Sequence, residues 1–214
     1  MKRALVFQGG WQGHDPAGSA ALAVRSLEPE GFAVDVSATL EVLHDAGALA
    51  AYDLIVPVWT MGELSAEGER NLMRVVEAGT GLAGWHGGMG DAFRASLGYK
   101  MMVGGQFVAH PGDITRYTVR ITAGDDPITQ GLDDFELMSE QYYMHVDPSN
   151  EVLAETTFAG DAQPWLEGVV MPVAWRRRWG KGRVFYLSIG HAVAEFDVPQ
   201  AATLLRRGLT WASR

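Results

Sequence analysis

The stretch GLAGWHGG, residues 81–88, decides the fold. Residues Gly81–Trp85 are all apolar or glycine, which predicts a strand buried on both faces, as in a parallel sheet. His86 stands at the end of this strand, and a short helix through Phe93–Leu97 is expected to follow. This strand–turn–helix order is that of a nucleophile elbow, which lifts one side chain above the carboxyl edge of a sheet. An imidazole there can be a general base, a metal ligand or a hydrogen-bond donor; the alternative is a tight turn whose histidine caps backbone groups.

Outward from this stretch, the N-terminal half alternates short apolar runs with helical patterns, which is typical of βαβ units and a parallel sheet. Strands are expected at Ala4–Phe7, Phe32–Val36 and Leu54–Trp59, with helices after Pro16 and Ser65. From about Tyr117 strands dominate, at 117–122, 152–158, 173–175 and 184–189, and a last helix is expected to begin at Asp197. The sequence therefore predicts one α/β domain over residues 1–214. Its central sheet should be mostly parallel, with helices on both faces and a β-rich C-terminal half.

Composition limits the function and the location. The chain has no cysteine, which excludes disulfides, thiolate zinc sites and a cysteine nucleophile. Its formal charge of −9 argues against nucleic-acid binding, because phosphates need a positive surface. No apolar stretch approaches the roughly 18 residues that span a membrane, and the run Ala4–Phe7 is too short for a signal peptide. We therefore expect a cytoplasmic protein without a membrane partner.

A second histidine follows the apolar strand expected at Val184–Ile189. His191 comes directly after Gly190 at the end of that strand. If the strand joins the same sheet in parallel, His86 and His191 emerge at one edge, where ligands of open α/β sheets bind. Glu195 or Asp197 could then orient an imidazole, although Asp197 is also expected to cap the last helix.

Further candidates lie elsewhere in the chain, and the loop of His14 should open at the same edge as His86. Glu140 is expected to be catalytic together with His86 and His191, in a polar-aromatic group that also holds Tyr142, Tyr143 and His145. Carboxylates bind sugar hydroxyls and aromatic rings stack on sugar C–H faces, so this group suits a sugar; the alternative is a strand edge with aromatic packing. The residues expected to bind substrate are Gly10, Trp11, His14, Trp85, Gly87, His110 and Tyr143.

A divalent metal is a further hypothesis. His86, His191 and His14, with Glu140, offer the nitrogen and carboxylate ligands that zinc, manganese or nickel accepts. No H-x-x-x-H or H-E-x-x-H spacing places two of these ligands together, so the sequence alone defines no site and no cofactor is certain. GGWQG at residues 9–13 is not a dinucleotide fingerprint, which argues against a nicotinamide cofactor.

Several motifs together resemble the ThuA-like (trehalose utilisation) family of the class I glutamine amidotransferase-like superfamily. They are GGWQGH at 9–14, GLAGWHGG at 81–88, VGGQFVAHP at 103–111, DPITQGL at 126–132, PVAW at 172–175, GKGRVFY at 180–186 and GH at 190–191. The resemblance spans nearly the whole chain and implies a flavodoxin-like fold. It also implies that His86 takes the place of the amidotransferase cysteine nucleophile and that His191 corresponds to the late histidine. Without a thiol, glutamine hydrolysis through a thioester is excluded.

The resemblance implies a role in the use of trehalose, other disaccharides or keto-sugars, and three hypotheses remain open. The first is an enzyme that acts on a sugar with a histidine-centred site. The second is a non-catalytic carbohydrate-binding or regulatory module on the same scaffold. The third is a metal-assisted hydrolase of another small polar substrate. A small sugar is the expected ligand, and a homo-oligomer is compatible with this scaffold.

Overall fold

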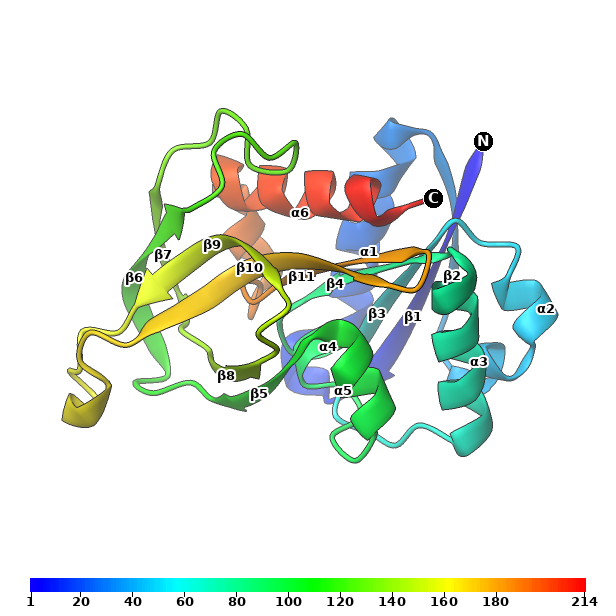
Figure 1. Ribbon diagram of the computed structural model, residues 1–214, viewed down its shortest axis with the longest axis horizontal. Coiled ribbons are helices and arrows are strands. Elements are labelled where there is room, and N and C mark those ends of the chain that lie inside the picture. The colour runs from blue at the N-terminus through cyan, green and yellow to red at the C-terminus, as the bar shows by residue number, and fades with distance from the viewer.

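The computed structural model describes all residues, Met1–Arg214, and is built on a nine-stranded sheet. Five strands form its parallel half in the order β2-β1-β3-β4-β11, each parallel to its neighbour (Figure 1). Their bounds are β1 Lys2–Gly10, β2 Phe32–Ser37, β3 Leu54–Thr60, β4 Gly81–Trp85 and β11 Gly182–Leu187. All five residues of β4 are buried, which confirms a central strand covered on both faces.

The antiparallel half continues the same sheet beyond β11, in the order β10-β9-β6-β7. These strands are β10 Val170–Trp179, β9 Glu151–Thr157, β6 Ile114–Ile121 and β7 Phe135–Glu140. A separate antiparallel pair is formed by β5 Gly105–Ala109 and β8 Tyr143–Val146. The prediction of a mostly parallel sheet in the first half and a β-rich second half is confirmed.

Helices cover both faces of the sheet. α1 Pro16–Leu27 and α6 Pro199–Ala212 pack on one face, and α3 Ala66–Ala78 and α5 Leu97–Val103 pack on the other (Figure 1). The shorter helices are α2 Ala46–Leu49 and α4 His86–Gly90, and 3₁₀ turns lie at 12–14, 28–30, 40–44, 164–166 and 193–197. Strand β1 feeds both apolar layers, because Ala4 and Val6 point to one face and Leu5 and Phe7 to the other. No helix is long and apolar enough to cross a membrane.

Two expected helix boundaries are wrong. After β4 the chain enters α4 at His86 itself, and the next helix begins only at Leu97, where the Ser96 hydroxyl accepts a hydrogen bond from the amide of Tyr99. The last helix begins at Pro199 rather than at Asp197, which ends the 3₁₀ turn Val193–Asp197. Proline suits the first helical position because it lacks the amide that would have no partner there.

Candidate functional site

His86 occupies a strained elbow at the carboxyl end of β4. Its φ angle is 45°, in the left-handed region that residues other than glycine seldom adopt, and the residue is buried. The Tyr186 hydroxyl from the neighbouring strand β11 donates to the His86 carbonyl at 3.1 Å. The strain and the buried support fix the imidazole at the point where the parallel sheet ends.

The hydrogen bonds of the His86 ring define its tautomer. Nδ1 lies 2.8 Å from the carbonyl oxygen of Ser188, which can only accept, so Nδ1 carries the proton. In the neutral ring Nε2 therefore presents a lone pair. A backbone carbonyl on one nitrogen, with the other nitrogen left for an ion or a proton, is the usual environment of a metal-ligating histidine.

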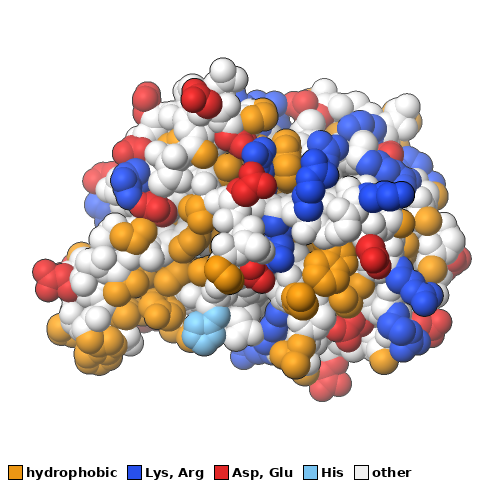
Figure 2. Space-filling model, viewed as in Figure 1, with side chains coloured by type: hydrophobic (Ala, Val, Ile, Leu, Met, Phe, Trp, Pro, Cys, Tyr) orange, Lys and Arg blue, Asp and Glu red, His pale blue; other side chains and the backbone are white.

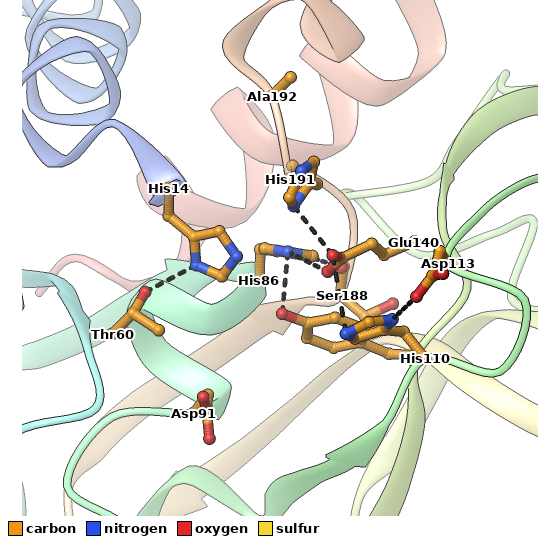
Figure 3. A network of polar contacts seen from close by, with 12 residues as sticks. His14, Thr60, His86, Asp91, His110, Asp113, Glu140, Ser188, His191 and Ala192 are labelled. Carbon is orange, nitrogen blue, oxygen red and sulfur yellow. Dashed lines mark hydrogen bonds and ion pairs between the residues drawn. The ribbon is translucent and has the colours of Figure 1, made fainter. Parts of the chain in front are cut away.

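Two groups of the antiparallel half meet the free nitrogen of His86. The Tyr142 hydroxyl lies 2.8 Å from Nε2, and its ring stacks on the imidazole at 4.2 Å between centroids. Glu140 Oε2 lies 3.1 Å from the same nitrogen (Figure 3). A carboxylate beside an imidazole lone pair is repulsive unless a proton or a cation lies between them. The arrangement therefore calls for one of the two.

His191 reaches the same place from β11. The parallel pairing of β11 with β4 confirms that the two histidines emerge at one edge of the sheet. His191 Nδ1 is buried and lies 3.2 Å from Glu140 Oε1, yet it makes no hydrogen bond of acceptable geometry. A buried nitrogen without a partner is costly, and a bound ion would satisfy it.

Glu195 positions the His191 loop rather than the imidazole, contrary to expectation. Its two carboxylate oxygens accept hydrogen bonds from the amides of Gly190, at 2.9 Å, and Ala192, at 3.2 Å. The helical turn of residues 193–197 directs this carboxylate back to the backbone on either side of His191. The loop is thereby fixed, and the ring remains free to face Glu140.

His14 completes the group from the loop after β1. Its Nδ1 lies 2.8 Å from the Thr60 hydroxyl at the end of β3, and Figure 3 shows its other ring nitrogen on the side of His86. Two close approaches need glycine: a Cβ on Gly10 would lie 2.1 Å from the Thr60 carbonyl oxygen, and one on Gly87 would lie 2.5 Å from the His14 ring. Burial, followed by the proximity of His86 and His191, lowers the pKa of His14 to about 3. His14 is therefore a neutral ligand throughout the physiological pH range.

The four side chains converge on one point. Ring centroids lie 4.7 Å apart for His14 and His86, 5.3 Å for His14 and His191, and 5.6 Å for His86 and His191. One ligand atom from each of the three histidines and Glu140 lies within 4.8 Å of the others. Nitrogen and oxygen ligands sit about 2.1 Å from zinc, so two ligands of a tetrahedral site lie about 3.4 Å apart. A contraction of the side chains by roughly 1 Å would close this metal cluster around an ion, and its three nitrogens and one carboxylate suit zinc or a similar cation.

The charge of the cluster comes from Glu140. Burial alone would raise the pKa of this carboxyl. When His86 is protonated, its Nε2–H donates to Glu140, and this hydrogen bond, with the charges of protonated His86, His191 and His110, outweighs burial and lowers the pKa. Tyr142 behaves oppositely, because burial raises the pKa of its hydroxyl well above the ordinary value. The site thus combines an ionised carboxylate with a phenol that keeps its proton.

His110 borders the cluster without joining it. Its Nε2 lies 3.8 Å from Glu140 Oε1 and its Nδ1 lies 3.3 Å from Asp113 Oδ1, on a half-exposed loop after β5. Of the four residues of the cluster, His191 also lines a groove of about 480 Å³. The groove is lined by Ile114, Leu137, Met138, His191, Ala192, Ala194, Glu195 and Val198.

Two residues expected to bind substrate lie elsewhere. Trp85 is buried against Phe196 in the apolar core, because the last residue of β4 points to a covered face. Tyr143 packs on Phe158, at 6.0 Å between centroids, away from the cluster. Trp11 is 48% exposed and meets His14 edge-on, so it stays at the rim of the site. Tyr142, one position before Tyr143, is the aromatic residue that contacts His86.

The chain is similar to known proteins in both sequence and structure. The sequence model of the ThuA family, described as trehalose utilisation, matches residues 3–212. A ThuA-like protein from Bacteroides uniformis superposes with a TM-score of 0.82 at 18% identity, covering 99% of this chain and 91% of that one. One from Parabacteroides merdae gives 0.80 at 18% identity, covering 99% and 89%.

A larger protein contains the same fold as a part. A β-galactosidase from Rahnella sp. R3 superposes with a TM-score of 0.62 at 18% identity, covering 99% of this chain and 30% of that one. No curated protein matches the sequence significantly. At 18% identity the structural similarities establish the fold alone. The match of the family model to residues 3–212 also assigns the chain to a family.

Proposed function

The chain belongs to the ThuA family, and we propose that it is an enzyme of sugar utilisation that acts on a disaccharide or keto-sugar at a divalent metal centre. The ligands of this centre are His14, His86, His191 and Glu140. The observation that carries the proposal is the environment of His86. Its Nδ1 is committed to a backbone carbonyl while its Nε2 faces a carboxylate oxygen at 3.1 Å, an arrangement that a cation stabilises.

The donor set favours chemistry at a carbonyl or hydroxyl oxygen of the sugar. Glycosidases that cleave directly use two carboxyl groups, whereas the metal cluster holds one, Glu140. The chain also lacks the cysteine of an amidotransferase. When bound, a divalent ion would act as a Lewis acid on a substrate oxygen. A keto-sugar offers such an oxygen beside further hydroxyl groups, so it fits the centre better than a simple glycosidic bond.

Three side chains handle protons beside the centre. Glu140 Oε1, on the side of the carboxylate away from His86, can accept a proton, and His110 Nε2, 3.8 Å from this oxygen, is close enough to take the proton through one water. His110 is half-exposed and can exchange that proton with solvent. Tyr142 keeps its hydroxyl proton because of its raised pKa, so it can donate to a substrate oxygen once His86 Nε2 binds the ion. We also expect the enzyme to be cytoplasmic, which fits the cysteine-free sequence.

Metal analysis of the purified protein tests the proposal, with His86→Ala as the variant and His44→Ala as the matched control. His44 is a surface histidine that contacts Glu41 and Ser65, outside the cluster. We expect about one divalent ion per chain in the wild type and in His44→Ala, and none in His86→Ala.

Turnover then distinguishes an enzyme from a binding module. A panel of disaccharides and keto-sugars is assayed with and without a chelator, and activity should disappear on chelation and return with zinc or manganese. A wild type without metal, or turnover that survives chelation, would contradict the metal centre. Sugar binding without turnover in any metal-loaded sample would indicate a non-catalytic module.

A further inference from the structure

A second concave surface lies between β6 and β9, next to the chain segments that follow His110 and Glu140. β6 and β9 pair only at Arg120–Glu155 and Ile121–Ala154, and the two strands then separate. The separation leaves a groove of about 670 Å³, within the range of small-molecule sites. The loop that carries the 3₁₀ turn Pro164–Leu166 closes its outer side and projects beyond β9 and β10 at the lower left of Figure 1. We name this surface the β6–β9 groove.

Neutral hydrogen-bonding groups dominate the lining of the β6–β9 groove. The side chains with hydroxyl or amide groups are Thr115, Thr118, Thr156, Thr157, Gln141 and Gln163. The backbone of β6 adds to them, because residues 115–118 pair with β7 on one side and with no strand on the side of β9. Such groups form the hydrogen bonds that a polyhydroxylated ligand needs.

Gln141 is a buried amide with one end unused. Its Nε2 donates to the Thr156 hydroxyl at 2.8 Å and to the Thr157 carbonyl at 3.3 Å. Its Oε1 accepts no hydrogen bond within the protein, although only 5% of the residue is exposed and it lines the groove. The amide is therefore held in place with an acceptor available to a ligand.

The charged residues of the β6–β9 groove are mostly neutralised by the protein itself. Arg116 pairs with Glu136 at 3.3 Å and Arg120 pairs with Glu155. Asp134 accepts a hydrogen bond from the Ile121 amide at 2.8 Å. Asp161 is the one charged lining residue without such a partner, so an anionic ligand would find little free countercharge, whereas an uncharged ligand would not need any.

Aromatic surface accompanies these polar groups. Tyr117 and Phe158 line the β6–β9 groove but are almost fully buried, so the exposed aromatic face is that of Trp165, 76% exposed, on the turn between the lining residues Gln163 and Leu166. Figure 2 shows hydrophobic side chains gathered over the tip that carries this turn, with no Lys or Arg on it. Aromatic faces beside hydroxyl and amide groups match a pyranose, which has apolar C–H faces and an equatorial rim of hydroxyls.

We propose that the β6–β9 groove binds a neutral di- or oligosaccharide. The inference rests on the proposed function only in taking the ligand to be a carbohydrate. Two chain segments run from the metal cluster to this groove: His110 is followed by Pro111 and Gly112, and Glu140 is followed by Gln141. The groove therefore holds sugar units beside the centre at which the chemistry takes place.

Calorimetric titration of chelator-treated protein with trehalose and with maltotriose tests this site apart from the metal. Ala159→Trp fills the groove from an exposed position in its wall, and Ala51→Trp places the same indole on an exposed turn elsewhere. We expect Ala159→Trp to weaken sugar binding at least about tenfold, and Gln163→Ala to weaken it about fivefold, the effect of one net hydrogen bond. Ala51→Trp should bind as the wild type does.

The outcomes separate this inference from the proposed function. Wild-type affinity in a folded Ala159→Trp, or no binding of either sugar by the wild type, would overturn the groove as a carbohydrate site whatever the metal content. Sugar binding in the groove by a protein that has neither metal nor turnover would support the carbohydrate site and contradict the proposed enzyme.

Discussion

The parallel and antiparallel halves of the sheet contribute different chemistry to one site. His14, His86 and His191 all come from the parallel half, each within a few residues of the end of β1, β4 or β11. Glu140 and Tyr142 come from the antiparallel half, at the end of β7 and in the turn that follows. The neutral nitrogen ligands thus belong to one half, and the negative charge and the phenolic proton belong to the other.

The two halves also hold their groups differently. In the parallel half the backbone does the positioning: the Ser188 carbonyl fixes the ring of His86, and glycines at 10 and 87 let the His14 loop approach. In the antiparallel half the side chains of Glu140 and Tyr142 contact the ring of His86 directly. In the proposed metal centre, the parallel half would therefore form the rigid part, and the antiparallel half would supply the negative charge that attracts a cation.

Glu140→Gln should have the largest effect, because it removes the only carboxylate of the metal cluster while keeping the shape of the side chain. We expect zinc affinity to fall at least about 100-fold, the upper end of what outer-shell changes cost, and turnover to disappear with it. Zinc titration of chelator-treated protein measures the affinity.

Glu136→Gln is the matched control for this change, since Glu136 lies on the same strand but pairs with Arg116 at the surface. It should bind zinc as the wild type does. If Glu140→Gln also did so, the centre would consist of the three histidines of the parallel half alone, and the division between the halves would be wrong.

Tyr142→Phe should have a smaller effect, confined to turnover. The ring still stacks on His86, so the metal content should be kept, but the proton donor is lost. General acid catalysis contributes roughly 100-fold or more, so we expect kcat to fall about 100-fold. Metal analysis and steady-state kinetics are measured on the same samples. Tyr143→Phe, whose ring lies against Phe158 outside the cluster, should leave both unchanged; equal losses in the two variants would indicate a packing defect.

The same division explains what the sequence predicts well. In a parallel sheet, apolar runs mark the strands and the residue after each run stands at the common edge, so His86 and His191 follow from local pattern. The resemblance to ThuA-like proteins adds the superfamily but not the geometry.

The antiparallel contributions depend on pairings that no local pattern encodes. The place of Glu140 depends on β7 pairing with β6, which joins β9 through only two residue pairs. Whether Tyr142 or Tyr143 faces His86 depends on where β8 begins, and a shift of one residue exchanges the two rings. Helix starts are equally hard to place, because Ser96 caps a helix that begins only at Leu97, and Pro199 outweighs the capping signal of Asp197.

The smallest expected effect is a pH dependence of stability that comes from His14. In the unfolded chain this imidazole takes up a proton near its ordinary pKa of 6.5, whereas in the folded protein burial and the neighbouring histidines delay protonation to about pH 3. Between these values the unfolded state binds more protons, so stability falls as the pH is lowered from 6.5 towards 3. The loss of folding stability is smaller than the full pKa shift would give, because the ring is only partly buried.

His14→Gln isolates this contribution, since glutamine cannot titrate and can still bond to the Thr60 hydroxyl. Urea unfolding of chelator-treated protein at pH 7.5, 6 and 5 should show a shallower decline for His14→Gln than for the wild type, whereas the surface variant His44→Gln should keep the wild-type slope. Glu140 does not interfere in this range. Because its pKa is lowered in the folded protein, its contribution to folding stability is lost only when the pH falls below 4.5, the ordinary pKa of the carboxyl. An unchanged slope in His14→Gln would mean that water reaches the ring and that the parallel half does not hold it as a neutral ligand.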